Sequence, residues 1–180
     1  MLKLEIDYSK ILRKQMRNSK LFLITLLSLP LFSESYYTAD KVIIKKSTHM
    51  LYLSSGGEIF KKFHISLGQA PIGAKEFEGD MKTPEGRYRL DWRKISSKYN
   101  KSIHISYPNQ QEKKSAKVMG LNAGGMIMIH GTPLNWGLLP VGNWIPELLD
   151  WTEGCIAMNN DDMEEVWNST QNGTEIVILP

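Results

Sequence analysis

The sequence contains one cysteine, Cys155, among its 180 residues. Exported domains of this size usually carry cysteines in pairs, because oxidising compartments form disulfides that stabilise small folds. A single cysteine excludes any disulfide within the chain. It leaves two interpretations open, either a buried thiol that packs as a small apolar side chain or a reactive nucleophile.

Long apolar runs are also missing. The run from Leu21 to Phe32 has 12 residues, whereas a helix that crosses a bilayer needs about 20. Basic residues precede this run and Ser33-Glu34-Ser35 follows it, which is the pattern of a secretory signal. We interpret residues 1–35 as an N-terminal extension with a signal peptide cleaved near Ser35. An uncleaved segment is the alternative and would be the chain's one membrane attachment.

Met16 immediately precedes the basic residues Arg17 and Lys20. Translation from Met16 would give a signal of more typical length, so we hypothesise that the true start lies there. Residues 36–180 are then one domain, because a chain of this length buries one good core but is short for two. The signal predicts export to the periplasm or the cell wall.

An excess of positive charge is absent from residues 36–180. Residues 1–35 hold six of the 22 Lys and Arg and three of the 19 Asp and Glu, which leaves 16 of each sign in the remainder. A nucleic-acid-binding domain needs surplus cations to neutralise phosphates. The balanced charge therefore argues against a nucleic-acid partner.

Internal repeats and low-complexity tracts are absent from residues 36–180, and the pattern there is mostly one of strands. Two β-branched and aromatic runs flank Gly56-Gly57, which predicts a hairpin. Gly68 to Gly86 is rich in glycine, proline and lysine, so we expect a long functional or flexible loop. Strands are predicted at residues 42–46, 49–55, 58–68, 87–93, 102–106, 126–129 and 174–179.

Two short helices complete the prediction. One runs from Gln110 to Met119 and ends at Gly120; the other runs from Asp161 to about Ser169 with Asn160 as its cap. Met163, Val166 and Trp167 share one face of the second helix. The expected fold is mainly β with one or two short helices.

The segment DWTEGCIAMNN, from Asp150 to Asn160, offers the sharpest chemistry. Gly154 allows close backbone approach, and the amides around Cys155 and Ile156 can serve as an oxyanion hole. A thiol near pKa ~8.5 needs a base to attack at neutral pH. His130 is the candidate base, because it follows the apolar run MIMI at a strand end; Thr152 is either a hydrogen-bonding partner or a turn residue.

IHGTP (Ile129 to Pro133) and TEGC (Thr152 to Cys155) resemble the His-Gly and Ser/Thr-x-Gly-Cys motifs of the L,D-transpeptidase catalytic domain, also called the YkuD domain. The resemblance includes KTPEGRY (Lys82 to Tyr88), HISYPN (His104 to Asn109) and GGMIMIHG (Gly124 to Gly131), and covers nearly all of residues 40–180. The form DWTxGCIA looks like a subgroup of this family.

The resemblance implies a β-sandwich-like fold and a cysteine acyl-enzyme that acts on peptidoglycan stem peptides without a cofactor. By matching motif positions, Cys155 would be the nucleophile and His130 the base, with Thr152, Gly154 and Ile156 in the active-site loop. In this family a backbone carbonyl often orients the histidine. The acyl group would pass to an amine acceptor, with a hydrolytic L,D-carboxypeptidase or amidase as the alternative. The resemblance also suggests β-lactams of the carbapenem type as inhibitors, and a substrate cleft that includes Gly131, His104, Tyr107 and Trp151.

Two positions depart from the common motif. Glu153 stands where histidine is usual, and Ala157 where arginine or asparagine is usual. The segment between His130 and Cys155 is also longer than in most members and contains Trp136 and Trp144. These differences bear on substrate specificity and on the outcome of the reaction.

Other classes of function fit the sequence less well. A zinc hydrolase would use His49, His64, His104 and His130, but their spacing matches no ligand motif. A non-catalytic wall-binding domain would stack ligands on Trp92, Trp136, Trp144 and Trp151, although aromatics are more often core residues. The acidic residues Asp150, Asp161, Asp162, Glu164 and Glu165 lack EF-hand spacing, so we interpret most of them as helix N-terminal charge rather than a calcium site.

Overall fold

The computed structural model describes residues 37–96, 98–133, 135–136 and 149–180. The predicted signal peptide, its cleavage site, the Met16 start and Trp144 lie outside these residues. In the described part, no helix is both long enough and apolar enough to span a membrane.

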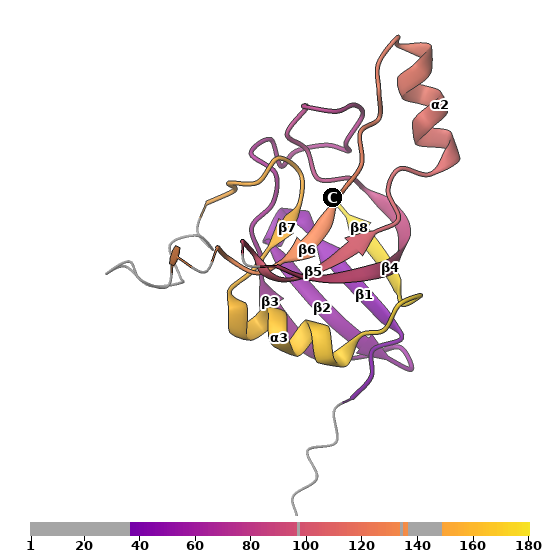
Figure 1. The fold of residues 1–180 in the computed structure, drawn as a ribbon. Coiled ribbons are helices and arrows are strands. Elements are labelled where there is room, and N and C mark those ends of the chain that lie inside the picture. Colours follow the sequence, from indigo (N-terminus) through magenta and orange to yellow (C-terminus); the bar gives the residue numbers. More distant parts are fainter. Residues whose placement is uncertain (1–36, 97, 134, 137–148) are drawn as a thin grey trace, which may run out of the picture. The chain divides into compact units, whose positions relative to one another are not determined.

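Eight strands of the described chain form one sheet in the order β3-β2-β1-β8-β4-β5-β6-β7 (Figure 1). In the described ranges the sheet is accompanied by the short α-helices α2 and α3 and the 3-10 helix η2, so the predicted mainly β fold is confirmed. The elements are β1 (Lys41–Lys45), η2 (Lys46–Thr48), β2 (Met50–Ser55), β3 (Glu58–His64), β4 (Gly86–Ser96), β5 (Asn100–Ile105), α2 (Gln110–Val118), β6 (Met128–His130), β7 (Ile156–Ala157), α3 (Asn160–Ser169) and β8 (Glu175–Leu179).

The long strand β4 joins the two halves of this sheet. Its first residues, Gly86 to Arg89, pair with β8, and its later residues, from Leu90 onward, pair with β5. The β4–β5 register shifts between Leu90 and Arg93, and such an irregularity bends and twists a strand. The sheet therefore curls, which gives the sandwich-like form that the sequence predicted.

The inner faces of the two halves share one apolar core. Val42 and Leu53 from β1 and β2 belong to the same buried cluster as Ile103 from β5 and Ile129 from β6. Each of these side chains is fully buried. Because alternate residues of a strand face opposite sides, burial of Ile129 turns Met128 and His130 toward the other face of β6.

The predicted hairpin and helices are found, with one correction. Gly56 and Gly57 adopt positive φ between β2 and β3, as a tight hairpin turn requires. Helix α3 is capped by Asn159, not by Asn160: the Asn159 side chain accepts a hydrogen bond from the Asp162 amide at 2.8 Å. Asn159 has the extended backbone of a cap residue, whereas Asn160 is already the first helical residue.

The apolar run at residues 126–129 was predicted as a strand, and the structure shifts it by two residues. Strand β6 covers Met128 to His130, so His130 is its last residue. Met126 has a φ of 56°, a left-handed conformation that an extended strand does not allow. Hydrophobicity alone gave no sign of this turn. The two-residue strand β7 was also not predicted.

The segment from Gly68 to Gly86, predicted as a loop, is held by two buried lysines. The Lys46 ammonium donates hydrogen bonds to Gly73 O at 2.6 Å, to Thr83 O at 3.0 Å and to the Glu85 carboxylate at 2.8 Å. The Lys75 ammonium donates to Asp80 Oδ1 at 2.7 Å, and both of these side chains are at most 4% exposed. These bonds fix the loop at two places along its length.

Asp80 is the acceptor at the centre of this loop. Its carboxylate accepts backbone hydrogen bonds from Glu76, Phe77 and Lys82. Burial raises the pKa of the Asp80 carboxyl, but the Lys75 ammonium and the three amides lower it more, so the pKa lies below its ordinary value. The ionised form is therefore the one that the fold stabilises.

We expect Lys75→Met to lower the free energy of unfolding by about 3 kcal/mol, because it leaves the buried Asp80 carboxylate without its cation. Urea denaturation at pH 7 measures the change. Lys61→Met is the matched control, since its partner Glu165 is at the surface, and it should leave the midpoint unchanged. Equal midpoints for both variants would contradict this account.

The same carboxylate predicts a pH dependence. Because its pKa is depressed on folding, Asp80 contributes stability above the ordinary aspartate pKa of about 3.9, and this contribution is lost as the pH falls through the folded value. The difference in stability between wild type and Asp80→Asn should therefore be full at pH 6 and shrink below about pH 4. A difference that stays constant down to pH 3 would exclude the ionised pair.

Candidate active site

Strands β6 and β7 bring His130 and Cys155 to one face of the sheet. The two strands pair in parallel, with Ile129 beside Ile156 and His130 beside Ala157. One step back in this register, Cys155 lies next to Met128, whose backbone amide approaches its sulfur. Neighbouring strands lie ~4.8 Å apart and two residues along a strand rise ~6.6 Å. The Cα atoms of His130 and Cys155, which lie on this diagonal, are therefore roughly 8 Å apart. An aromatic side chain can span such a diagonal.

A backbone carbonyl orients the His130 ring. Nδ1 of His130 lies 2.7 Å from the carbonyl oxygen of Gly131. A carbonyl can only accept, so Nδ1 carries the proton and Nε2 is left as the acceptor. Gly131 is closely packed, because a Cβ on it would lie 2.1 Å from Asn160 Oδ1 and 3.2 Å from Tyr99 O.

Two aromatic rings enclose His130. The centroid of the Tyr99 ring lies 4.6 Å from that of the His130 ring. The Trp151 centroid lies 5.6 Å from it, with the two rings edge-on. His130 is 5% exposed. Burial lowers the pKa of its imidazole, the Gly131 hydrogen bond raises it, and Lys98 lowers it again, so the pKa lies below the ordinary value. His130 is consequently a neutral base at pH 7.

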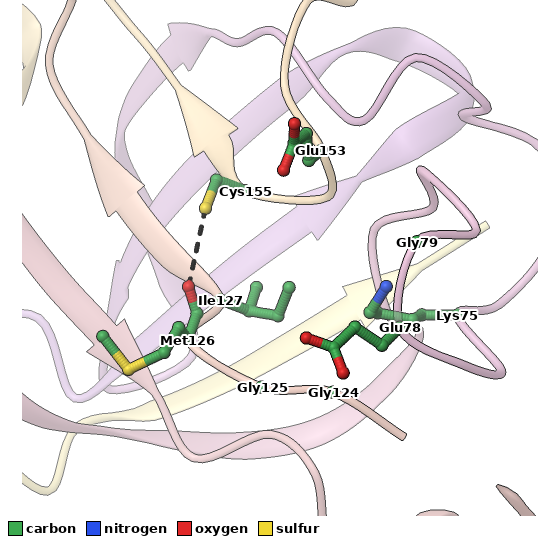
Figure 2. A pocket seen from close by; sticks show the side chains of 9 residues that line it. All are labelled: Lys75, Glu78, Gly79, Gly124, Gly125, Met126, Ile127, Glu153 and Cys155. Carbon is green, nitrogen blue, oxygen red and sulfur yellow. Dashed lines mark hydrogen bonds between the residues drawn. The ribbon is translucent and has the colours of Figure 1, made fainter. Parts of the chain in front are cut away.

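Cys155 is half-buried, and its Sγ lies 3.7 Å from the carbonyl oxygen of Met126 (Figure 2). Burial raises the pKa of the thiol, the Met128 amide lowers it, Glu153 raises it and Lys75 lowers it, and the net direction is upward. The resting site is thus a neutral thiol with a neutral imidazole rather than a preformed ion pair.

Thr152 shapes the turn that presents Cys155. Its hydroxyl donates to Cys155 O at 2.7 Å and accepts from the Gly154 amide at 3.1 Å. Of the two roles considered from the sequence, the structure therefore supports the turn. The Gly154 amide is already engaged, so the Cys155 and Ile156 amides remain the candidate oxyanion donors.

Gly154 is needed for a reason that the sequence did not reveal. Its φ is 128°, and an added Cβ would lie 2.6 Å from the carbonyl oxygen of Lys82. The close approach is to the KTPEGRY segment rather than to an open cleft. Thr83 in the same segment accepts a hydrogen bond from the Gly68 amide. The KTPEGRY segment is therefore fixed in place and packs against the turn that presents Cys155.

The base of the turn is anchored by Asp150. Its carboxylate accepts hydrogen bonds from the Leu67 amide at 2.8 Å, and it pairs with His49 Nε2 at 2.9 Å. Thr152 continues the attachment, since its amide donates to Leu67 O. Asp150 is therefore a structural anchor in this fold.

Two residues predicted at or near the site have side chains in the core. Ile156 follows Cys155 directly, so its backbone stays in the predicted loop, but its side chain is fully buried, with 0% exposure. Tyr107 is also a core residue, 3% exposed, whose hydroxyl donates to Ala123 O. Its ring packs against the Tyr88 ring instead of lining a cleft. No sequence pattern distinguished a core position from a cleft position for Tyr107.

His104 lies on the same face of the sheet as His130 but two strands from Cys155. It pairs across β5 and β6 with Met128, while its Nδ1 lies 2.6 Å from Asp91 Oδ1 and its ring stacks on Trp92. Its place is therefore at the periphery of the site.

Trp136 packs on Trp151 with 4.8 Å between the ring centroids, so these tryptophans form an aromatic cluster beside His130.

Among the described residues, no group of three or more His, Cys, Asp and Glu side chains is arranged to hold a metal ion. Of the acidic residues, Asp161 and Asp162 occupy the first turn of α3 as predicted. Glu164 and Glu165 pair with Lys101 and Lys61.

A pocket of about 210 Å³ adjoins Cys155 (Figure 2). Its wall includes Lys75, Glu78 and Gly79 from the loop, Glu153, and residues 124–127. Sequence reasoning did not place Glu78 or Lys75 at the site, since they lie far from Cys155 in the chain and meet it only through the fold.

The chain belongs to the L,D-transpeptidase catalytic-domain family, YkuD, whose family model matches residues 39–178. The Escherichia coli K12 protein named "Putative L,D-transpeptidase YafK" is 24% identical over 129 residues, which cover 69% of this chain and 50% of YafK. The helical cell shape determining protein Pgp2 from Campylobacter jejuni is similar in structure, with a TM-score of 0.58 and 29% identity over 77% of this chain and 46% of Pgp2.

L,D-transpeptidase 3 from Mycobacterium tuberculosis, solved with a faropenem-derived adduct, shares the fold. Its TM-score is 0.50 at 15% identity, over 78% of this chain and 60% of that one. The chain spans about half the length of YafK and of Pgp2.

The charge beside Cys155 gives a prediction about its reactivity. Glu153→Gln removes a nearby negative charge that raises the thiol pKa, so alkylation by iodoacetamide at pH 7 should become severalfold faster. In both proteins the rate should rise with pH as the thiolate forms. Intact-mass spectrometry over time measures the rates. Glu58→Gln, on the exposed part of β3, should match wild type, and an unchanged Glu153→Gln rate would show that Glu153 does not act on the thiol.

Proposed function

We propose that the protein is a peptidoglycan-modifying L,D-transpeptidase that forms an acyl-enzyme on Cys155. The observation that supports this proposal is the His130–Gly131 hydrogen bond, which leaves Nε2 without a proton on a residue that lies on the same face of the sheet as Cys155. Family membership supports the substrate class, because the matching model is that of an L,D-transpeptidase catalytic domain.

In the first step, His130 Nε2 accepts the thiol proton as Cys155 Sγ attacks a stem-peptide carbonyl. The Cys155 amide donates a hydrogen bond to the oxyanion that develops on that carbonyl. The tetrahedral intermediate then expels the amine, which takes the proton from His130. A thioester on Cys155 remains, and the sequence of steps requires no cofactor.

In the second step, an amine of another stem peptide attacks the thioester, and His130 accepts the proton of that amine. The new amide bond is the crosslink and the thiol is regenerated. Water in place of the amine gives the hydrolytic outcome, a carboxypeptidase or amidase. The size of the site does not favour the amine over water. The reaction products must therefore be identified to distinguish transfer from hydrolysis.

The setting of the reaction belongs to the same proposal. We place the protein in the periplasm or cell wall after export, where peptidoglycan is accessible. Similarity to a protein that determines helical cell shape supports a role in shaping the wall. The adduct derived from the β-lactam faropenem on a protein of the same fold supports β-lactams as acylating inhibitors of Cys155, the carbapenem type among them.

Incubation of the protein with purified muropeptides, followed by intact-mass spectrometry and product analysis, tests the proposal. We expect an adduct on wild type and none on Cys155→Ala. His130→Gln should slow acylation by at least about 100-fold, the usual contribution of a general base. Crosslinked products would establish transfer and shortened stems would establish hydrolysis.

A well-folded wild-type protein that gives neither adduct nor product would contradict the enzyme. A domain that binds the wall through Trp92, Trp136 and Trp151 would then be favoured, and its binding would survive Cys155→Ala. As a control, alkylation of Cys155 by iodoacetamide at the wild-type rate would show that the His130→Gln variant keeps an accessible thiol.

A further inference from the structure

Helix α2 turns its lysines away from the rest of the protein. The helix stands clear of the sheet between two extended connections (Figure 1). Lys113, Lys114 and Lys117 are exposed, whereas Ala116 is fully buried. Residues three and four positions apart are neighbours on a helix surface, so Lys113 and Lys114 both lie beside Lys117. The outer face of α2 therefore carries three adjacent positive charges.

The one acidic residue of α2, Glu112, points to the inner side of the helix. Its carboxylate accepts hydrogen bonds from the Tyr88 hydroxyl and from the Asn109 amide. The Asn109 side chain accepts in turn from the Glu112 amide at 3.0 Å, which completes a capping box. Because Tyr88 is a core residue, these bonds hold the carboxylate against the body of the protein. The outer face keeps its positive charge.

A glycine turn places apolar side chains beside these lysines. Gly120 has a φ of 72°, its amide donates to Lys117 O at 3.0 Å, and the Leu121 amide donates to Ala116 O at 2.9 Å. These two bonds form a Schellman motif, which folds the residue after the glycine back over the last turn of the helix. Three large apolar side chains are consequently exposed together at the helix end: Val118, which is 81% exposed, Met119 and Leu121.

The loop between β3 and β4 approaches α2 from a different side. Glu76 of that loop lines a pocket together with Ser115 and Met119 of the helix and its end. None of the three exposed lysines of α2 is among the described residues that line this pocket. Glu76 and the basic face therefore lie on different sides of α2, and the carboxylate leaves the basic face unpaired.

We propose that the outer face and the C-terminal end of α2 bind the surface of an anionic phospholipid bilayer. The three lysines pair with lipid phosphates, while Val118 and Leu121 enter the boundary between headgroups and acyl chains. Basic and apolar side chains on one surface give reversible attachment to such a membrane. The apolar side chains favour a bilayer over a soluble polyanion, which offers no apolar phase.

This surface lies outside the lining of the pocket beside Cys155. The inference therefore goes beyond the proposed function and does not depend on the acyl-enzyme. Failure of either one leaves the other standing.

A fluorescent label on α2 reports contact between this surface and lipid, whatever residues 1–35 contribute to attachment. The full chain carries Val118→Cys together with Cys155→Ala, so the label has a single thiol to react with. An environment-sensitive apolar fluorophore then takes the place of the valine side chain. We expect its emission to rise severalfold with vesicles of equal parts phosphatidylglycerol and phosphatidylcholine.

Two controls show that the rise depends on charge and on position. With phosphatidylcholine alone, half-maximal emission should need at least roughly tenfold more lipid, and 1 M salt should remove the rise, because the Debye length there is about 3 Å. The same label at Ile59→Cys, an exposed position on β3 at the other end of the strand order, should keep its emission.

Variants of the labelled chain test the two kinds of side chain. Each of Lys113→Gln, Lys114→Gln and Lys117→Gln should raise the lipid concentration for half-maximal emission about fivefold. Lys61→Gln is the matched control, since this lysine of β3 is exposed and pairs with Glu165, and it should leave that concentration unchanged. Leu121→Ser should also raise it severalfold, because an inserting side chain is lost while the charge stays. Near-UV circular dichroism confirms that each variant is folded.

Three results would overturn the inference. The first is constant emission of the α2 label with anionic vesicles, or an equal rise with phosphatidylcholine alone. The second is a set of α2 lysine variants that respond like Lys61→Gln. The third is a Leu121→Ser variant that responds like the parent chain, which would assign the basic face to a soluble polyanion instead of a bilayer.

Discussion

The parallel pairing of β6 with β7 is the constraint on which the candidate site depends. These strands have three and two residues, so little of their position comes from their own ladder. Further bonds hold them: Met158 donates to His130 O, and Ala157 exchanges backbone hydrogen bonds with Ser66. With Ile129 and Ile156 fixed in the core, His130 and Cys155 are directed to the opposite face together.

The loop between β3 and β4 supports the same pair from outside the sheet. It is held by buried lysines at Lys46 and Lys75, and it offers the Lys82 carbonyl against which Gly154 packs. A substitution that disrupts the packing of Lys82 on Gly154 is therefore expected to change the position of Cys155. Catalytic sites need such support, because small displacements of a nucleophile slow its reaction strongly.

The sequence predicted the parts of the fold that follow from local pattern. The Gly56-Gly57 hairpin, helix α2 and the buried face of α3 have local signals, and Cys155 and His130 stood out through their motifs. The cap at Asn159 was missed because either of two adjacent asparagines satisfies the same preference. Strand β7 was missed because two residues show no periodicity, and its formation depends on neighbours distant in the chain.

Within the site, long-range contacts account for most of what the sequence did not show. Tyr107 and Ile156 sit beside motif residues in the chain, yet the fold buries both in the core. Glu78 reaches the pocket only because Asn122 and Gly124 pack against it. The motifs pointed to Cys155 and His130, whereas the residues that line the pocket beside Cys155 depend on tertiary structure.

The protonation state of the His130–Cys155 pair tests the central claim most directly. Nitrogen-15 NMR of the His130 ring at pH 7, read together with thiolate absorbance at 240 nm and compared with Cys155→Ala, reports both groups. The account predicts a proton on Nδ1, none on Nε2 and a neutral thiol. A doubly protonated ring with a thiolate, or a proton on Nε2 in place of Nδ1, would contradict it.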